Sequence, residues 1–262
     1  MIVTLGDLLL DVIVRLEQPF AEGADADAVT RLGTGGQAAN VAAWVAELGG
    51  QARLVGKRAA DEAGRTATGA LERYGVDVRG PVVEGRTGTI VSLVGLDGER
   101  TMASDRGISP DLRADELDPE WFADEWLHLP GYSLVRSPID EAALRAAGLA
   151  RCVSVDLSSW SAIRDFGPER FRARIEQLQP VVVFANEAEE KIIGGPIPGT
   201  MWIAKLGPRG ARFGDEERPA RSTETVDTTG AGDAFAAGWL LGGADLALEA
   251  AARCVAKLGS MP

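Results

Sequence analysis

Short apolar runs and longer stretches with apolar residues every three or four positions alternate along most of the chain. The short runs predict buried strands, and the longer stretches predict amphipathic helices. The expected strands are Met1–Leu5, Leu8–Leu16, Ala52–Val55, Trp126–Leu129, Cys152–Leu157, Val181–Ala185, Met201–Lys205 and Ala211–Phe213. The expected helices are Gly35–Gly49, Asp61–Tyr74, Ile139–Ala147, Pro168–Gln177, Glu187–Ile192, Gly232–Leu241 and Asp245–Leu258. This alternation predicts an α/β fold with a doubly wound, mostly parallel sheet and helices on both faces.

Two segments interrupt this rhythm and predict a small β-rich lid. In Val12–Leu32 and Val78–Thr101, apolar and polar residues alternate, which is typical of half-buried strands. Leu96–Glu99 carries the Asp-Gly signal of a hairpin turn. We expect residues 1–262 to form a single domain, with insertions at about 12–32 and 78–101 that form the lid at an edge of the sheet.

Composition and charge narrow the expected partners. The chain has 39 acidic and 27 basic side chains, a net charge of −12, and no basic run, so we expect no nucleic-acid partner. No apolar stretch is long enough to span a membrane, and Asp7 and Asp11 interrupt the N-terminal apolar segment. We therefore expect no membrane partner, no signal peptide and a cytoplasmic location. The two cysteines lie in apolar segments, where we expect them to be buried rather than to form a disulfide framework or a metal cluster.

The segment Asp227–Phe235, with the sequence DTTGAGDAF, is the strongest candidate for chemistry. Gly230, Ala231 and Gly232 stand where a polar segment enters an Ala-rich helix, so their N–H groups can point toward one bound anion, typically a phosphate. Asp233 follows in the first helical turn. A carboxylate beside an anion site can deprotonate a hydroxyl that attacks a phosphoryl group. The plainer interpretation is that Asp233 only caps the helix.

A second glycine-rich segment, Gly33–Asn40, allows two interpretations. Gly33, Gly35 and Ala38 have the spacing of a dinucleotide-binding turn, which would indicate an NAD-dependent oxidoreductase. That match is weak, because a polar, broken segment precedes it and no acidic residue follows the next strand. The alternative is a turn whose backbone contacts a polar ligand, with Asn40 facing the same ligand or capping local backbone.

The residues present exclude several other mechanisms. No Gly-Lys-Ser/Thr sequence follows a glycine loop, so a phosphotransferase with this sequence would not use a P-loop. There is also no Ser nucleophile elbow. The only histidine, His128, lies in an apolar strand and is expected to be a core residue, which argues against Ser-His-Asp and His–metal chemistry.

Together, the two glycine motifs resemble the paired signatures of the ribokinase-like (PfkB-type) carbohydrate kinase family. The resemblance covers nearly the whole chain, with its elements in the family's order. These elements are Gly35–Gly49 (GGQAANVAAWVAELG), Asp61–Gly64 with Leu71 and Gly75–Asp77, Asn186-x-x-Glu189, Lys205–Ala211 (KLGPRGA) and Asp227–Phe235.

The resemblance implies ATP- and Mg²⁺-dependent phosphorylation of a hydroxymethyl group on a sugar or sugar derivative. It implies Asp233 as general base, with Gly230, Ala231 and Gly232 as the anion hole for the transferred phosphoryl group. The implied sugar-binding residues are Asp11, Gly35, Gly36 and Asn40. The implied nucleotide-binding residues are Asn186, Lys205, Gly207 and Gly210, and Glu189 is the implied Mg²⁺ contact, through water. Other implied features are a homodimer through the lid and a monovalent cation near Asp227.

Several positions keep alternatives open. Asp11 can be a solvated acid at a strand end, Glu189 part of a solvated helix face, and Gly207 and Gly210 simple turn formers. Arg106 either reaches an anionic or hydroxyl-rich substrate or is exposed.

The sequence departs from the family near the implied nucleotide site. The connection from Glu189 to Met201 is shorter than in relatives, and Lys205 replaces the usual Thr, which places a cation close to the expected phosphates.

Two alternative functions share the fold: a nucleoside kinase, and a non-catalytic sugar or nucleotide sensor. The low aromatic content, 6%, and a single aromatic residue in the expected lid, Phe20, favour a sugar, because bases stack on aromatic rings.

Overall fold

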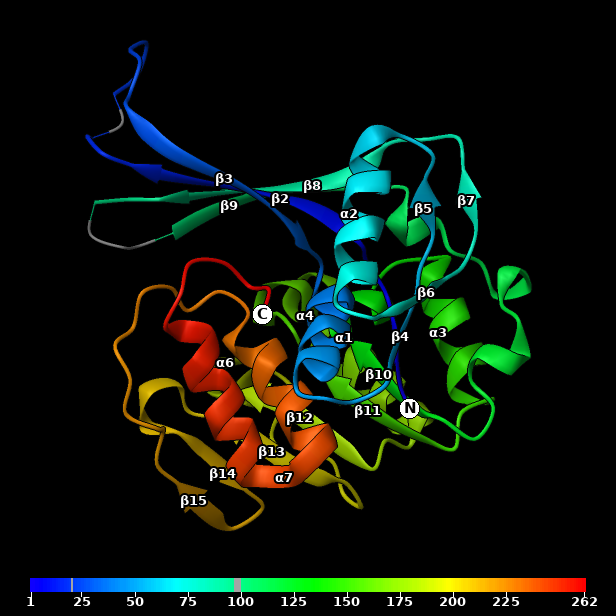
Figure 1. Cartoon of the computed structure of the whole chain (residues 1–262). Coiled ribbons are helices and arrows are strands. Elements are labelled where there is room, and N and C mark those ends of the chain that lie inside the picture. Colours follow the sequence, from blue (N-terminus) through cyan, green and yellow to red (C-terminus); the bar gives the residue numbers. More distant parts are fainter. Residues whose placement is uncertain (20, 97–99) are drawn as a thin grey trace.

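The computed structural model describes residues 1–19, 21–96 and 100–262 (Figure 1). Strands and helices alternate along most of the chain, as the hydrophobic pattern predicts. Three residues of the predicted hairpin turn, Asp97, Gly98 and Glu99, lie outside the described residues, as does Phe20.

A nine-stranded sheet forms the centre of the molecule, in the order β15-β14-β13-β12-β11-β10-β1-β4-β6. Its strands are β1 (Ile2–Leu5), β4 (Ala52–Val55), β6 (Asp77–Arg79), β10 (Trp126–Pro130), β11 (Cys152–Asp156), β12 (Val182–Asn186), β13 (Met201–Lys205), β14 (Ala211–Phe213) and β15 (Glu216–Arg218). The seven strands from β13 through β12, β11, β10, β1 and β4 to β6 run parallel to one another. Strand β14 pairs with β13 in the antiparallel direction, and β15 pairs with β14 in the same way, at one end of the sheet. The register places Val3 of β1 between Leu127 and Arg53. The doubly wound, mostly parallel sheet expected from the sequence is confirmed.

Helices cover both faces of this sheet. They are α1 (Gln37–Glu47), α2 (Glu62–Arg73), α3 (Ile139–Ala147), α4 (Trp160–Phe166), α5 (Pro168–Leu178), α6 (Glu187–Ile192) and α7 (Ala231–Val255). One hydrophobic core joins α1, α2 and α7 to one face, and a second core joins α3 to α6 to the other. Successive strand residues point to opposite faces, so Ile2 belongs to the first core and Val3 to the second.

The C-terminal part agrees with the two helices predicted there. Element α7 consists of two helical stretches that meet at a kink at Gly243, whose φ of 73° and ψ of −156° are not helical. One helical segment differs from the sequence prediction. Helix α4 was not predicted, because it is too short to show a helical period. Ser159 precedes its first residue and caps it, because the Ser159 side chain accepts a hydrogen bond from Ala162 N.

A separate four-stranded sheet projects from the body of the molecule (Figure 1). Its order is β3 (Ala28–Gly35), β2 (Leu9–Leu16), β8 (Thr87–Val94) and β9 (Arg100–Gly107). Residues of β6, which fall in the segment 78–101 predicted for the lid, instead pair with β4 in the main sheet. They do so because α2 returns the chain to the sheet edge in a βαβ unit. Two short strands, β5 (Arg58–Ala59) and β7 (Val82–Val83), pair separately.

The structure tests three smaller predictions. Cys254 is buried as expected, but Cys152 is only half-buried, because it begins β11 at the edge of the core. His128 is completely buried in β10, where its Nδ1 lies 2.9 Å from Ser154 Oγ, and burial lowers its pKa to about 4. It is thus a neutral core residue, as predicted. Among the described helices, none is both long and apolar enough to cross a membrane.

Candidate active site

The strand order of the main sheet changes direction between β1 and β10. From β1 the chain proceeds to β4 and β6 on one side, and later to β10, β11, β12 and β13 on the other. In open α/β sheets, ligands bind at the carboxyl ends of the strands that flank such a point. The small sheet leaves the body at this edge, because β2 follows β1 directly and β3 leads into α1 (Figure 1).

The N-terminus of α7 is a turn that requires glycine. Gly230 is the residue before the helix, its φ is 77°, and no side chain caps the helix there. A β-carbon at Gly230 would lie 2.6 Å from the Cα of Ser260, so the C-terminal residues close over this turn. A β-carbon at Gly232 would lie 3.3 Å from the Nζ of Lys205. Backbone N–H groups of a long helix and a lysine ammonium are therefore neighbours, an arrangement that binds anions.

Asp233 is buried in the first turn of α7 and contacts α1. Its Oδ2 accepts a 2.7 Å hydrogen bond from Asn40 Nδ2. Burial raises the pKa of Asp233 to about 7; the Asn40 hydrogen bond and Lys205 oppose this rise, and the charge of Asp156 adds to it. The hydrogen bond joins two helices, so the side chain does more than cap its own helix. A carboxyl group with a pKa near neutrality is suited to accept a proton at physiological pH.

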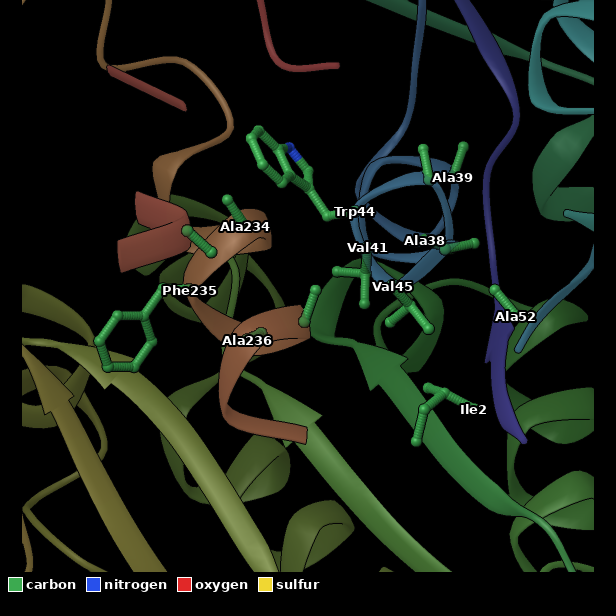
Figure 2. Close-up of a cluster of buried hydrophobic side chains, with 14 of the residues drawn as sticks. Ile2, Ala38, Ala39, Val41, Trp44, Val45, Ala52, Ala234, Phe235 and Ala236 are labelled. Atoms are coloured by element: carbon green, nitrogen blue, oxygen red, sulfur yellow. The ribbon is translucent and has the colours of Figure 1, made fainter. Parts of the chain in front are cut away.

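Tight packing of α1 against α7 positions this pair of side chains. Figure 2 shows Trp44 and Ala234 in the cluster between the two helices, and both are completely buried. Trp44 Nε1 donates a 2.9 Å hydrogen bond to the carbonyl of Ser260, and Ser260 Oγ donates to Asn40 Oδ1 at 3.2 Å. Ser260 thereby holds the side-chain amide of Asn40 in one orientation, and that amide in turn orients the carboxylate of Asp233.

Lys205 belongs to a buried group of charges beside the anion site. Its Nζ donates a 2.6 Å hydrogen bond to Oδ2 of Asp156, which is completely buried at the end of β11. Burial by itself would lower the pKa of Lys205, but Asp156 and Glu189 raise it above its ordinary value, so the ammonium stays charged. The ammonium of Lys205 thus interacts with the carboxylates of both Asp156 and Glu189, and it lies next to Gly232.

Asn186 and Glu189 form a reciprocal cap at the start of α6. Asn186 N donates to Glu189 Oε2 at 2.8 Å, and Glu189 N donates to Asn186 Oδ1 at 2.9 Å. Glu189 is 1% exposed, so its interpretation as part of a solvated helix face is wrong. Burial raises the pKa of its carboxyl group, and the charge of Lys205 opposes that rise.

Asp11, Gly35 and Gly36 lie together where the small sheet joins the body. Any side chain at Gly35 would overlap the Asp11 carboxylate, and Gly36, with φ 98°, packs directly on the backbone carbonyl of Asp7. Asp11 Oδ1 is buried without a hydrogen-bond partner, and burial raises the pKa of Asp11 to about 6. Asp11 as a whole is half-buried, so it is not a freely solvated acid at the strand end. A buried carboxylate oxygen without a donor is instead suited to bind a ligand hydroxyl.

Gly207 and Gly210 shape the turn after β13. Gly207 has φ 60° and Gly210 has φ 107°, both in the left-handed region that glycine adopts easily. A β-carbon at Gly210 would overlap the backbone carbonyl of Arg218 and lie 2.6 Å from Ala220 N. Both residues fit the role of turn formers, and Gly210 also allows two backbone segments to approach closely.

Several residues that sequence reasoning did not assign join the site. Asp156 is one, and its only signal in the sequence is an acidic residue at the end of an apolar strand. Arg106, which was left open, is not exposed: it pairs with buried Asp7, and its guanidinium carbon lies 4.0 Å from the ring centroid of Tyr132. This contact joins β9 of the small sheet to the ends of β1 and β10. The sequence shows no pattern for it, because its three residues are far apart in the chain.

Comparisons with known proteins agree with this fold. The model of the pfkB family carbohydrate kinases matches residues 1–261. Fructokinase-1 of Zea mays is 32% identical over 265 residues, which cover 90% of this chain and 80% of the maize protein. ATP-dependent ribose-1-phosphate kinase of Halopiger xanaduensis is 32% identical over 274 residues, covering 97% of this chain and 90% of the archaeal protein.

Solved structures show the same architecture. A probable sugar kinase from Rhizobium etli superposes with a TM-score of 0.87 at 26% identity, covering 100% of this chain and 94% of the other. Adenosine kinase from Sinorhizobium meliloti gives a TM-score of 0.87 at 24% identity, with 100% and 95% covered. The fold and the glycine turn beside Asp233 define a ribokinase-like phosphotransferase. The chain belongs to the pfkB family of carbohydrate kinases, as the two glycine motifs indicate.

Proposed function

We propose that this carbohydrate kinase transfers the terminal phosphoryl group of ATP to a hydroxymethyl group of a sugar or sugar derivative. The observation that carries the proposal is the buried carboxylate of Asp233, with a pKa of about 7, in the first turn of a helix whose N-terminal glycine turn has no side-chain cap. A base and an anion site in adjacent positions match the two needs of phosphoryl transfer to an alcohol.

In the proposed reaction, Asp233 accepts the proton of the acceptor hydroxyl. The hydroxyl oxygen forms a bond to the terminal phosphorus of ATP, and the bond from that phosphorus to the bridging oxygen breaks, which releases ADP. The N–H groups of Gly230, Ala231 and Gly232 hold the oxygens of the phosphoryl group during transfer. Lys205, next to Gly232, neutralises part of their charge. Asn40 holds the carboxylate of Asp233 in place at 2.7 Å.

The residues proposed for the acceptor are Asp11, Gly35, Gly36 and Asn40. The buried, unpartnered Oδ1 of Asp11 would accept hydrogen bonds from sugar hydroxyls, and Gly35 and Gly36 allow β3 to pack closely on Asp11 and Asp7. Relatives named fructokinase and ribose-1-phosphate kinase support a sugar acceptor. The neighbour named adenosine kinase keeps a nucleoside acceptor as the second candidate.

Asn186, Lys205, Gly207 and Gly210 are the residues proposed to contact the nucleotide, with Glu189 as the residue toward Mg²⁺. Among proteins of similar structure, a sugar kinase from Pyrococcus horikoshii was solved in complex with ATP, and the Escherichia coli protein described as Ribokinase II with ATP and Mg²⁺. In the part of this chain that the structure describes, no three His, Cys, Asp or Glu side chains gather as a metal site. The buried carboxylate of Glu189 therefore fits a metal held mainly by phosphates and water, which would neutralise phosphate charge. A monovalent cation near Asp227 stays a prediction of the sequence.

Replacing Glu189 with Gln is expected to raise the Mg²⁺ concentration needed for half-maximal turnover by about tenfold or more. The fold should persist, because Gln can make the same reciprocal cap. Turnover is measured against free Mg²⁺ at saturating ATP. Glu187→Gln is the matched control, since Glu187 is exposed on the same helix. An unchanged Mg²⁺ dependence in Glu189→Gln would exclude the proposed role.

An ADP-release assay with Mg-ATP tests the proposed function. The acceptors are pentoses, hexoses, sugar acids, sugar phosphates and nucleosides. Turnover with a sugar or sugar derivative supports the proposal, and turnover with nucleosides alone supports the second candidate. ATP binding without turnover on any acceptor would favour the sensor.

We also propose that the small sheet closes over the acceptor as a lid and pairs two copies of the chain. Val29 and Leu32 on β3 and Met102 on β9 are large apolar residues that are 53%, 68% and 53% exposed. Light scattering is expected to give the mass of a dimer. Met102→Glu is expected to shift the mass toward a monomer, and a monomer in the unaltered protein would contradict this proposal.

A further inference from the structure

A cavity of about 400 Å³ lies between the small sheet, α2 and the C-terminal residues. Asp11 lines one wall, with Gly33 and Thr34 of β3 beside it, and Ser260 lines another. Asp11 and Ser260 also belong to the candidate active site, since Ser260 bonds to Asn40 and Asn40 bonds to Asp233. The cavity is thus continuous with the proposed acceptor site, and its size suits a small molecule.

Three basic side chains line this cavity: Arg31 from β3, Arg73 from the last turn of α2, and Lys257 from the C-terminal segment. Arg31 Nη1 donates a 3.0 Å hydrogen bond to the carbonyl of Leu258, which holds β3 close to that segment. Lys257 Nζ lies 5.0 Å from the centre of the Trp44 ring. Three separate elements therefore bring their positive charges to one cavity.

These three cations have no carboxylate partner within the ranges the structure covers. Most other arginines form ion pairs there, as expected in a chain with 39 acidic and 27 basic side chains. Among the described residues, other arginines such as Arg15 and Arg151 also form no ion pair, but at this cavity three such cations come from three separate elements. Burial lowers the pKa of Lys257, Cys254 and the carboxylate of Glu47 oppose this fall, and the charges of Arg253 and Arg31 add to it. Arg31 and Lys257 are therefore close enough to repel each other. A bound anion would relieve this repulsion.

We infer that the acceptor is a phosphorylated monosaccharide, whose phosphate binds among Arg31, Arg73 and Lys257 while Asp11 binds sugar hydroxyls. This inference rests on the proposed kinase function and names its substrate class. Three donors on separate elements match a dianionic phosphate better than a single carboxylate, because arginine and lysine together can contact all its oxygens. A neutral sugar would leave these charges without a partner.

The test compares matched acceptors in the ADP-release assay: fructose with fructose 6-phosphate, ribose with ribose 1-phosphate and ribose 5-phosphate, and gluconate as a sugar acid. At least one phosphorylated sugar is expected to have a kcat/KM at least tenfold above its neutral partner. Arg73→Gln is expected to lower kcat/KM for that sugar phosphate by roughly 10- to 100-fold, mainly through KM, because it removes one charge-assisted hydrogen bond.

The control is Arg145→Gln, which removes an exposed arginine from α3, far from the cavity lining in sequence and fold. Binding of the same sugar phosphates without ATP, followed by tryptophan fluorescence, gives a readout independent of catalysis. Binding that Arg73→Gln weakens, without turnover, would support this site and count against the kinase proposal. Turnover of neutral sugars or gluconate that equals or exceeds turnover of the sugar phosphates would overturn the inference and leave the kinase proposal intact. Neither binding nor turnover of any sugar phosphate would also overturn it.

Discussion

Asp233→Asn is expected to lower kcat by about a thousandfold, while binding of ATP and acceptor changes little. Removal of a positioned general base typically costs between a hundredfold and ten-thousandfold, and the amide keeps the size of the carboxylate and its contact with Asn40. The measurement is turnover of the best acceptor under saturating conditions, with binding followed separately. Turnover within tenfold of the unaltered protein would exclude Asp233 as the base.

The pH dependence provides an independent check on the same residue. Because the pKa of Asp233 is raised to about 7, its carboxyl group is protonated below that value, so kcat/KM is expected to fall as the pH drops from 8 to 6. The folded pKa lies above the unfolded value, so the ionised group costs stability as the pH rises toward 7 and above. Asp233→Asn is therefore expected to be at least as stable as the unaltered protein at pH 8. A loss of stability there would point to a structural cause of inactivity.

Lys205→Met is expected to lower both stability and activity. It leaves the carboxylate of Asp156 buried without its cation, which typically costs about 3–5 kcal/mol of unfolding free energy. It also removes the positive charge next to Gly232, where the transferred phosphoryl group is proposed to bind. Urea denaturation measures the first effect, and turnover measures the second.

A double variant separates these two effects. Asp156→Asn combined with Lys205→Met removes both members of the ion pair, so the share of the lost stability that comes from Asp156 should return, while Glu189 still lacks its cation. Activity should not return, because the charge near the phosphoryl site is still missing. Recovery of activity together with stability would show that Lys205 acts only as the partner of Asp156.

Much of the fold was predictable because it follows local rules. Alternating strands and helices, each long enough to show its period, predicted the central sheet. The sequence did not predict α4 and β15, because these elements are too short or too polar to show a hydrophobic period. It also misplaced β6, which pairs with β4 in the main sheet although its residues fall in the segment predicted for the lid. Strand pairing depends on partners distant in sequence, so the alternation in Val78–Thr101 alone could not assign it.

For the site, the sequence by itself determined the family, the helix turn at Gly230–Gly232 and the neighbouring Asp233, because these features depend on residues that are adjacent in the chain. Only the tertiary structure decided which side chains surround them. It paired Lys205 with Asp156, joined Arg106 to Asp7, packed Asp11 on Gly35, and brought Arg31, Arg73 and Lys257 to one cavity. The physical reason is that ionisation and binding depend on burial and on charges a few ångströms away, and these neighbours come from strands and helices that only folding brings together.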